Sequence, residues 1–303
     1  MRLGWAVSRR AASELISSGR VHVNGRRYRK GEPIAAGDRV EVIATGAADA
    51  IAPNRDLKID ILFEDAALIV ADKPALMPCH PLRADERNTV MNAIVATYPE
   101  TARAGDKPLE GGLVHRLDNG TSGALIIARN ADAFVAMREA LRTGRVTRRY
   151  LALVAGRVDR TVPTIEIATP IAHHVKNPRK MVVVEASANR FGAAVATVSA
   201  RYRSTPRPAF TKVERLSYED GFTLVQVTPR TGNRHQIRVH LASIGYPIAG
   251  DELYGGPPLA GLVAGRFWLH LAELEIESPA GGHVAAVAPL AHDLEDSLAR
   301  LRS

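Results

Sequence analysis

Residues 111–128, GGLVHRLDNGTSGALIIA, hold one carboxylate, Asp118, between two short apolar runs. These runs predict a short strand before Asp118 and a second strand over 123–128, with a turn rich in Gly, Asn, Ser and Thr between them. Because a strand fixes the origin of the loop beside it, a side chain at such a junction can be presented to a substrate. Asp118 is therefore the first candidate for a functional residue. The alternative is that Asp118 and Asn119 only start a hydrogen-bonded turn before Gly120.

The rest of the larger part of the chain predicts an α+β domain dominated by sheet. Helices are expected at 89–97, 131–143 and 232–244. The strands are not separated by regular helices, so a doubly wound parallel sheet is not expected. We predict a mixed or antiparallel sheet with flanking helices. Besides 123–128, the expected strands are 68–71, 150–154, 181–185, 195–203, 222–228 and 267–276.

The 303 residues have the apolar and charged content of a globular protein, with room for one larger and one smaller domain. No apolar run approaches the roughly 20 residues that cross a membrane. The first residues, MRLGW, lack the apolar segment of a secretory signal, so we expect a cytoplasmic protein that binds no membrane. Cys79 is the only cysteine, and we interpret it as a small, partly buried side chain rather than a nucleophile.

Positive charge is concentrated at the amino terminus. Residues 1–43 carry nine Lys or Arg and four Asp or Glu, a local +5 out of a net +8 for the whole chain. A small basic module points to a polyanion such as RNA or DNA, and the alternative is a solvated surface. Ser8 can cap a helix that ends at Gly19, Asn24-Gly25 predicts a tight hairpin, and 40–42 predicts a closing strand.

Three segments follow from these patterns. Residues 1–45 are assigned to a small basic α/β domain. Residues 46–58 are small, polar and without a clear period, and are assigned to a linker. Residues 59–303 form the larger domain.

Signatures of common cofactors and metals are absent from the sequence. There is no GxGxxG after a strand, no HExxH and no DxDxDG loop. His235 and His240 are five residues apart, which on a helix directs them about 140° apart, too far to share a metal. The pair His173-His174 has no partners at ligand spacing. We predict no metal site.

Three further residues are candidates on position alone. Arg234 and Arg238 lie four apart in the predicted helix 232–244 and leave the same face. They are either exposed surface charges, or one pairs with a carboxylate while the other takes a phosphate. Tyr150 either fills one face of a strand or serves a site. Spacing does not decide between these alternatives.

Four stretches together resemble the RluA type of RNA pseudouridine synthase, from about Leu62 to Leu294. FEDAALIVADKPALMPCHP (63–81) resembles the first motif of that family, and GGLVHRLDNGTSGALIIARN (111–130) its catalytic motif. RRYLALVAG (148–156) resembles the segment with the active-site tyrosine, and TGNRHQIRVHLASIGYPIAGDELYGG (231–256) the third motif. Residues 8–43 resemble the small RNA-binding domain named after a ribosomal small-subunit protein, also called the alpha-L type. In that domain a further helical stretch precedes the Ser-Arg-Arg position, so a truncated module or a late start is expected.

The resemblance implies roles for individual residues. Asp118 is implied as the catalytic aspartate, Tyr150 as the active-site tyrosine, and Arg238 as the arginine that pairs with the aspartate. Two positions depart from the family: Arg148 stands where Lys is usual, and Asn233-Arg234 replaces a frequent Arg-Thr pair. The residues expected to contact RNA are His115, Arg116, Arg9, Arg10, Arg26, Arg27, Arg234, His235 and Gln236.

The implied reaction converts uridine to pseudouridine. The glycosidic bond breaks, the base turns and rejoins through carbon 5, and the proton on carbon 5 leaves. No electrons are transferred, so the resemblance implies no cofactor. Asp118 would act as nucleophile or general base, Arg238 would keep it ionised, and Tyr150 would pack on the uracil and relay the proton. The uridine must leave its stack to reach such a pocket.

The substrate and the reaction have alternatives. The family pattern implies large-subunit ribosomal RNA, with transfer RNA as the alternative. An RNA N-glycosidase using the same aspartate with water, or a non-catalytic RNA-binding protein of ribosome assembly, are the other possibilities. RNA is the expected partner, and we expect a monomer.

Overall fold

The computed structural model describes residues 9–17, 19–42, 50–162, 164–184 and 202–302. The chain divides into two compact units, Met1–Ala50 and Ile51–Ser303. The division falls inside the range 46–58 that the sequence assigns to a linker. Ile51 is buried in the core of the larger unit, and Asn54 donates its backbone N–H to Asn92, so residues after Ala50 pack as part of that unit.

The smaller unit has one helix and three short strands. Helix α1 (Arg9–Ser17) is followed by Gly19 in the left-handed conformation (φ 76°), as its place at the helix end predicts. Strand β1 (Val21–Val23) pairs with β2 (Arg26–Arg27) and β3 (Val40–Val42) in the order β2-β1-β3. The hairpin turn has positive φ at both Asn24 (53°) and Gly25 (75°), which confirms the predicted tight turn. The predicted cap Ser8 lies outside the described residues, as do the side chains of Arg9 and Arg10.

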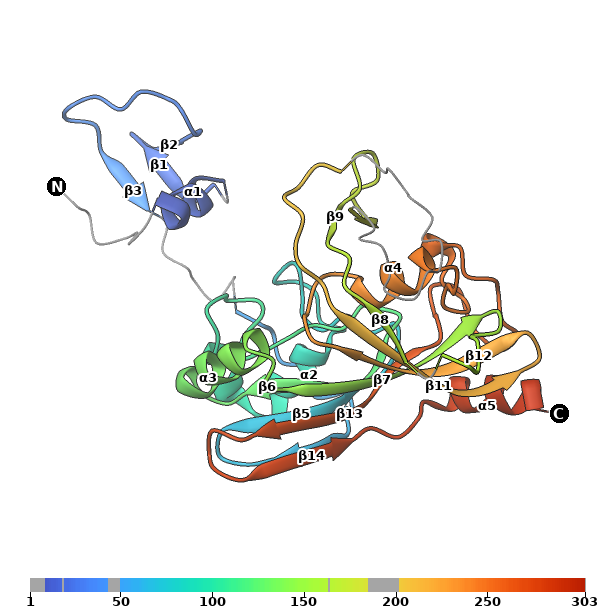
Figure 1. Ribbon diagram of the computed structural model, residues 1–303. Helices are drawn as coiled ribbons and strands as arrows, with labels where there is room; N and C mark the ends of the chain where they lie inside the picture. Colours follow the sequence, from blue (N-terminus) through green and yellow to red (C-terminus); the bar gives the residue numbers. More distant parts are fainter. Residues whose placement is uncertain (1–8, 18, 43–49, 163, 185–201, 303) are drawn as a thin grey trace. The chain divides into compact units, whose positions relative to one another are not determined.

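The larger unit is built on a nine-stranded mixed sheet in its described residues. The parallel pair in it is β6 with β13, and the other neighbours are antiparallel, which confirms the predicted mixed sheet. β14 (His283–Val287) pairs with the second half of β13. Figure 1 shows the sheet as one twisted surface running across the unit. In order across the sheet the strands are β4 (Ile61–Glu64), β5 (Leu68–Lys73), β6 (Ser122–Ala128), β13 (Leu269–Glu277), β7 (Thr147–Ala155), β12 (Phe222–Pro229), β11 (Thr211–Glu219) and β8 (Thr164–Ile167).

Helices and a second small sheet surround the main sheet. The small sheet pairs β9 (Ile171–His173) with β10 (Met181–Val183). Helix α2 starts after Thr89 and α3 after Asn130, close to the predicted helix starts, and each of these side chains accepts a hydrogen bond from the third residue of its helix. The helices are α2 (Val90–Thr97), α3 (Ala131–Arg142), α4 (Gln236–Ser243) and α5 (His292–Arg302), with 3₁₀ turns η2 (Pro99–Arg103) and η3 (Glu252–Tyr254).

Two sequence predictions need correction. The helix expected over 232–244 begins only at Gln236, because His235 is left-handed (φ 53°) and residues 231–235 form a turn. The strand expected before Asp118 does not form: Leu113 makes a single bridge to Ile127. The strand expected over 195–203 lies mostly outside the described residues, and that over 181–185 is β10.

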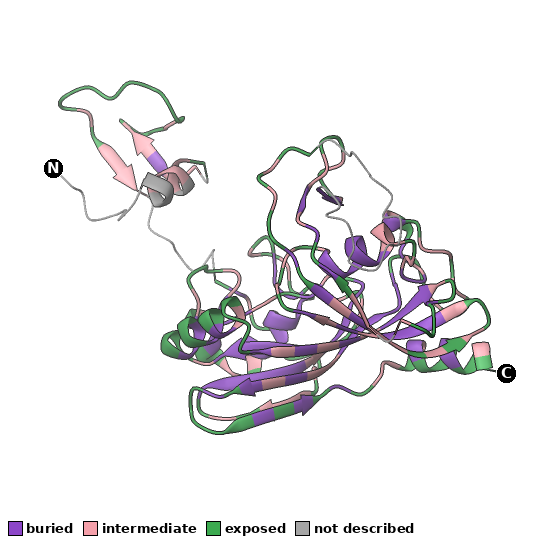
Figure 2. Cartoon of the chain, viewed as in Figure 1, coloured by how far each residue is buried: buried purple, intermediate pink, exposed green. Residues whose placement is uncertain are grey.

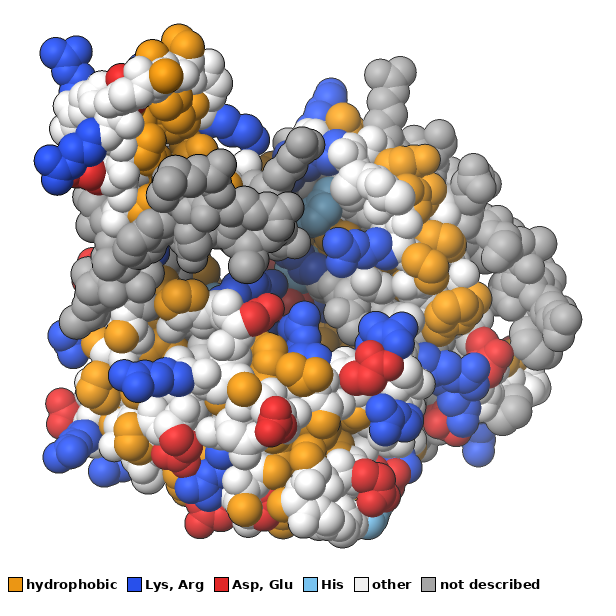
Figure 3. Space-filling model, turned by 90° about the vertical axis from the view of Figure 1, so that its left-hand side faces the viewer, with side chains coloured by type: hydrophobic (Ala, Val, Ile, Leu, Met, Phe, Trp, Pro, Cys, Tyr) orange, Lys and Arg blue, Asp and Glu red, His pale blue; other side chains and the backbone are white. Residues whose placement is uncertain are grey.

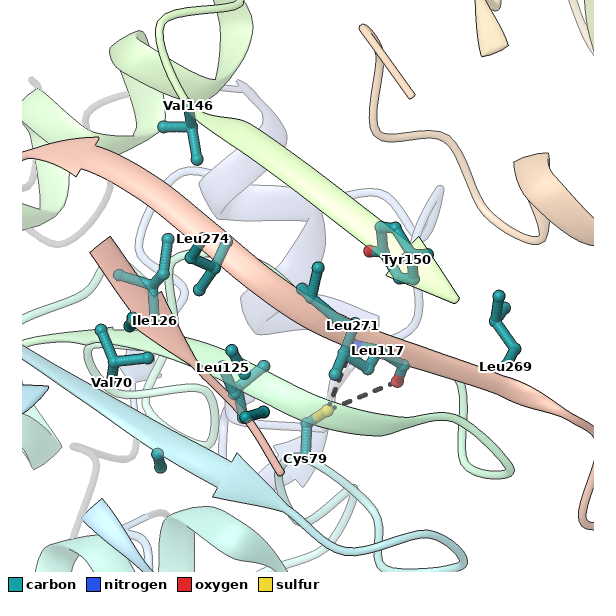
Figure 4. Packing of buried hydrophobic residues seen from close by; sticks show 14 of the residues in the cluster. Val70, Cys79, Leu117, Leu125, Ile126, Val146, Tyr150, Leu269, Leu271 and Leu274 are labelled. Atoms are coloured by element: carbon teal, nitrogen blue, oxygen red, sulfur yellow. Dashed lines mark hydrogen bonds between the residues drawn. The ribbon is translucent and has the colours of Figure 1, made fainter. Parts of the chain in front are cut away.

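The core lies along the centre of the sheet (Figure 2). All seven residues of β6 are buried, as expected for a strand covered on both faces. In Figure 4, Tyr150 of β7 and Leu271 of β13 pack with Leu117 and Leu125. This packing places the amino-terminal end of β6, and the turn that precedes it, against two neighbouring strands.

Candidate active site

Asp118 lies in a turn that leads into β6. The backbone N–H of Thr121 donates to the carbonyl oxygen of Asp118 at 3.0 Å. Five residues after Asp118, Gly123 has φ 110°, and a Cβ there would lie 2.2 Å from the carbonyl oxygen of Leu271. Only glycine fits this close approach of β6 to β13. The side chain of Asp118 keeps a quarter of its surface exposed, so its carboxylate is open to a substrate.

A buried lysine, Lys73, stabilises this turn by donating hydrogen bonds to its backbone carbonyl groups. Nζ of Lys73 donates to the carbonyl oxygens of Thr121 at 2.7 Å, Pro74 at 2.8 Å and Asn119 at 3.3 Å, and the residue is fully buried. Burial lowers the pKa of Lys73 to about 8. Arg266, also buried, donates to the carbonyl oxygen of Gly120 and forms an ion pair with Asp293 at 2.7 Å. Two cations therefore fix the carbonyl groups of the turn.

Cys79 supports the residue before Asp118. Its Sγ lies 3.4 Å from both the N and the O of Leu117, as the dashed lines in Figure 4 show. Burial raises the pKa of the Cys79 thiol. A buried neutral thiol is a poor nucleophile, and its role here is packing.

Arg238 connects two aspartates. Its Nη1 donates to Oδ2 of Asp118 at 2.9 Å, and its Nε and Nη2 donate to the two carboxylate oxygens of Asp251 at 2.7 and 2.8 Å. The guanidinium lies between the rings of Phe267, 4.2 Å from the centroid, and Tyr254, 5.1 Å away. Burial works against its charge, but Asp251 and Asp118 raise the pKa of Arg238 overall. Arg238 is therefore a fixed cation that orients the carboxylate of Asp118.

His235 is a neutral neighbour of Asp118. Its Nε2 lies 3.8 Å from Oδ1 of Asp118, and its Nδ1 lies 3.0 Å from the hydroxyl of Tyr254. That hydroxyl accepts the backbone N–H of Met181, so its own proton is free to bond Nδ1 of His235. Burial lowers the pKa of His235 to about 4, with Asp118 acting in the opposite direction. His235 thus contacts the site as an uncharged imidazole.

The remaining candidates lie at different depths. Arg116 is exposed, with Nη1 3.4 Å from Nε2 of His80. His115 accepts the backbone N–H of Ile126 through Nε2 at 3.1 Å, and burial lowers its pKa to about 3. Arg234 is exposed but precedes α4, so it does not share a helical face with Arg238 as the sequence predicts.

Gln236 differs from its prediction as an RNA contact. It is 3% exposed, and its amide bonds Phe210, Thr211 and Thr231. Gln236 therefore supports the turn that carries His235 rather than presenting its amide to RNA.

Tyr150 is buried on β7, paired in register with Leu271. Burial raises the pKa of its phenol, the charge of Arg148 opposes this effect, and that of Asp118 adds to it. The phenol therefore lies within the electrostatic reach of both charged groups. Arg26 and Arg27, the other predicted RNA contacts with described side chains, are exposed in the smaller unit.

Three residues of this arrangement were not among the sequence candidates: Lys73, Asp251 and Arg266. Lys73 and Asp251 lie within the quoted motifs at 63–81 and 231–256. Their spacing from Asp118 and Arg238 follows no pattern that would have identified them as site residues. In the described part of the chain, no three His, Cys, Asp or Glu side chains gather as metal ligands, and no helix is long and apolar enough to cross a membrane. Figure 3 shows Lys and Arg side chains gathered on one face of the larger unit around a recess in which histidine is seen.

The chain is similar to known proteins. Residues 67–243 match the family described as RNA pseudouridylate synthase, and residues 2–40 match the S4 domain. The chain is 34% identical over 297 residues to an uncharacterized RNA pseudouridine synthase of Chloroflexus aurantiacus, covering 98% of this chain and 86% of the relative. It is 31% identical over 307 residues to ribosomal large subunit pseudouridine synthase D of Pseudomonas aeruginosa, covering 97% of this chain and 88% of the relative.

A solved structure agrees with these relatives. Human RNA pseudouridylate synthase domain containing 4 matches with a TM-score of 0.59 at 27% identity, over 80% of this chain and 92% of that chain. The chain belongs to the RNA pseudouridylate synthase family, with an S4 domain at its amino terminus. It is an RNA pseudouridine synthase, an isomerase, which confirms the resemblance seen in the sequence.

Proposed function

We propose that Asp118 is the catalytic residue of this enzyme, with Arg238 and Tyr150 acting beside it. The observation that carries the proposal is the bridge from buried Asp251 through Arg238 to the partly exposed Asp118. Because Arg238 is held by Asp251 and two aromatic rings, it fixes the position of the partly exposed Asp118 carboxylate. A carboxylate placed in this way suits attack at the sugar or removal of a proton from it.

Tyr150 is assigned to the base. Its ring offers an apolar surface for a flipped uracil, and its phenol is a route for the proton that leaves carbon 5. A buried phenol with a raised pKa is a weak base, so it serves as a relay rather than as the final acceptor. The turn held by Lys73 and Arg266 keeps Asp118 in place while the base turns.

Large-subunit ribosomal RNA is the proposed substrate. Two relatives of similar length are named ribosomal large subunit pseudouridine synthase D. In the smaller unit, Arg26 and Arg27 are exposed to solvent and available to contact RNA. Transfer RNA remains the alternative. A monomer acting in the cytoplasm stays the expectation, and sedimentation of the purified enzyme tests the oligomeric state.

The test is an in vitro reaction with unmodified large-subunit ribosomal RNA and unmodified transfer RNA. Nuclease digestion and chromatography should show pseudouridine formed from uridine in the ribosomal RNA, with no change in RNA mass and no abasic site. An abasic site would identify an N-glycosidase instead. Pseudouridine in transfer RNA alone would replace the proposed substrate, and RNA binding without either product would contradict the proposal.

A further inference from the structure

Arg148 is a buried cation that the mechanism above does not use. It lies on β7 two residues before Tyr150, so both side chains leave the same face of the strand. The residue is 6% exposed. Its neighbour Arg149 leaves the opposite face and is only partly buried.

The guanidinium of Arg148 has few partners. Its Nη2 donates to the carbonyl oxygens of Pro229 at 3.4 Å and Thr231 at 3.3 Å, both long contacts. Its Nε is buried and has no hydrogen-bond partner in the described residues. Arg149, in contrast, pairs with Glu273 at 3.0 Å and Glu275 at 2.7 Å. Among the residues that the structure describes, Arg148 has no carboxylate within ion-pair distance, and a buried charge without a counter-ion destabilises the fold.

The surroundings of Arg148 belong to the active site. Its charge acts on Tyr150 and on His115, and Asp118 acts on the same phenol of Tyr150. Gly232, in the turn before α4, leaves room for the side chain, because a Cβ at this position would lie 3.2 Å from Nη1 of Arg148. Arg148 and Asp118 therefore act on the pKa of Tyr150 in opposite directions.

The charges around Asp118 do not by themselves favour a negatively charged uracil. Arg238 is shared by Asp118 and Asp251, so this group of three carries a net negative charge. When the glycosidic bond breaks, its electron pair stays on the uracil, which becomes an anion. That anion would form beside an excess of negative charge. A nearby cation without its own counter-ion would offset this repulsion.

We propose that Arg148 stabilises the detached uracil anion by donating to one of its carbonyl oxygens beside Tyr150. The inference rests on the proposed function of Asp118. The bond between C1′ and N1 breaks with its electron pair on the uracil. The base turns, carbon 5 bonds C1′, the carbon 5 proton leaves, and N1 takes up a proton, so the product is an isomer of the substrate. Arg148 acts only while the base is detached.

The test compares Arg148→Met, Arg148→Lys and the matched control Arg149→Met under single-turnover conditions, with each enzyme in saturating excess over the RNA. We expect Arg148→Met to slow the reaction by about 100-fold, with RNA affinity unchanged and Tm equal to or above that of the wild type, since a buried unpaired charge is removed. Arg148→Lys should restore much of the rate because it keeps the charge. Arg149→Met should keep the wild-type rate.

A second substrate probes the leaving group itself. In RNA with 5-fluorouridine at the target, fluorine stabilises the uracil anion, so loss of the fluorinated nucleoside should be slowed less by Arg148→Met than the reaction of uridine. Equal slowing of both bases would overturn the inference. So would weaker RNA binding at an unchanged saturated rate, which indicates a phosphate contact, or a fall in Tm that accounts for the lost activity. If the wild-type enzyme itself forms no pseudouridine, the proposed function fails, whereas an active wild type with an equally active Arg148→Met variant contradicts the inference alone.

Discussion

Replacing Asp251 by asparagine perturbs the support of Arg238 without touching Asp118. Asp251 is 1% exposed and accepts two hydrogen bonds from Arg238. Asparagine keeps one acceptor oxygen, so one charge-assisted hydrogen bond is lost, worth about 1.5–3 kcal/mol. Arg238 still has Asp118 as a counter-ion, so the loss should stay below the roughly 3–5 kcal/mol of a broken buried pair.

We expect Asp251→Asn to lower the free energy of unfolding by about 2 kcal/mol, a fall in Tm of about 4–8 °C for a unit of this size. Because the guanidinium also loses part of its fixed orientation toward Asp118, pseudouridine formation should fall about 10- to 100-fold. Circular dichroism measures the first effect, and release of tritium from carbon 5 of uridine in RNA measures the second.

The control for this variant is Glu139→Gln, which removes an exposed ion pair with Arg142. Such a pair contributes little, so Tm and rate should stay close to those of the wild type. If Asp251→Asn unfolds at the wild-type temperature and reacts at the wild-type rate, Asp251 does not hold Arg238 in the way described.

Three further predictions concern other parts of the chain. Burial lowers the pKa of Lys73 from 10.5 to about 8, so between these pH values the unfolded chain binds more protons than the folded protein. Raising the pH through this range should therefore stabilise the wild type relative to Lys73→Met. Urea unfolding at both ends of the range measures the difference in the free energy of unfolding, and a difference that does not change with pH contradicts the prediction. Cys79→Ala should retain most of the activity, and the buried thiol of the native enzyme should resist alkylation; an inactive but folded variant would make Cys79 a functional residue. The double change Arg26→Gln and Arg27→Gln should lower the slope of log RNA affinity against log salt by about 1–2 units, and an unchanged slope would remove these residues from the RNA contact.

Local patterns predicted much of the fold. The hairpin at Asn24-Gly25 and the helices expected at 89–97 and 131–143 formed close to their predicted positions, because local turns and the helix caps Thr89 and Asn130 decide where they begin. The mixed sheet also followed from the absence of regular helices between the strands. Such local features depend on residues that are close in the sequence, so residue composition and spacing predict them.

The start of α4 could not be predicted in this way. Thr231 has the chemistry of a helix cap, but its hydroxyl bonds Gln236 instead. The amide of Asn233 donates to the carbonyl oxygen of Pro208, which holds residues 231–235 in a turn. Contacts with a distant segment therefore override the local signal and leave His235 beside Asp118.

The site itself was only partly predictable. Asp118 and Arg238 are 120 residues apart, and the resemblance, not the spacing, indicated that they meet. Asp251 and Lys73 act through buried contacts with Arg238 and with backbone carbonyl groups, for which a single sequence has no distinctive pattern. In the sequence Arg148 likewise resembles an ordinary strand residue, and only the structure shows that no carboxylate among the described residues pairs with it.

We propose that the carboxylate of Asp118 drives the isomerisation. The most direct measurement is tritium release from carbon 5 of uridine in large-subunit ribosomal RNA by Asp118→Asn, with RNA affinity determined in parallel. We expect tritium release to fall to background while RNA affinity changes little. Release at the wild-type rate by a folded Asp118→Asn enzyme would contradict it.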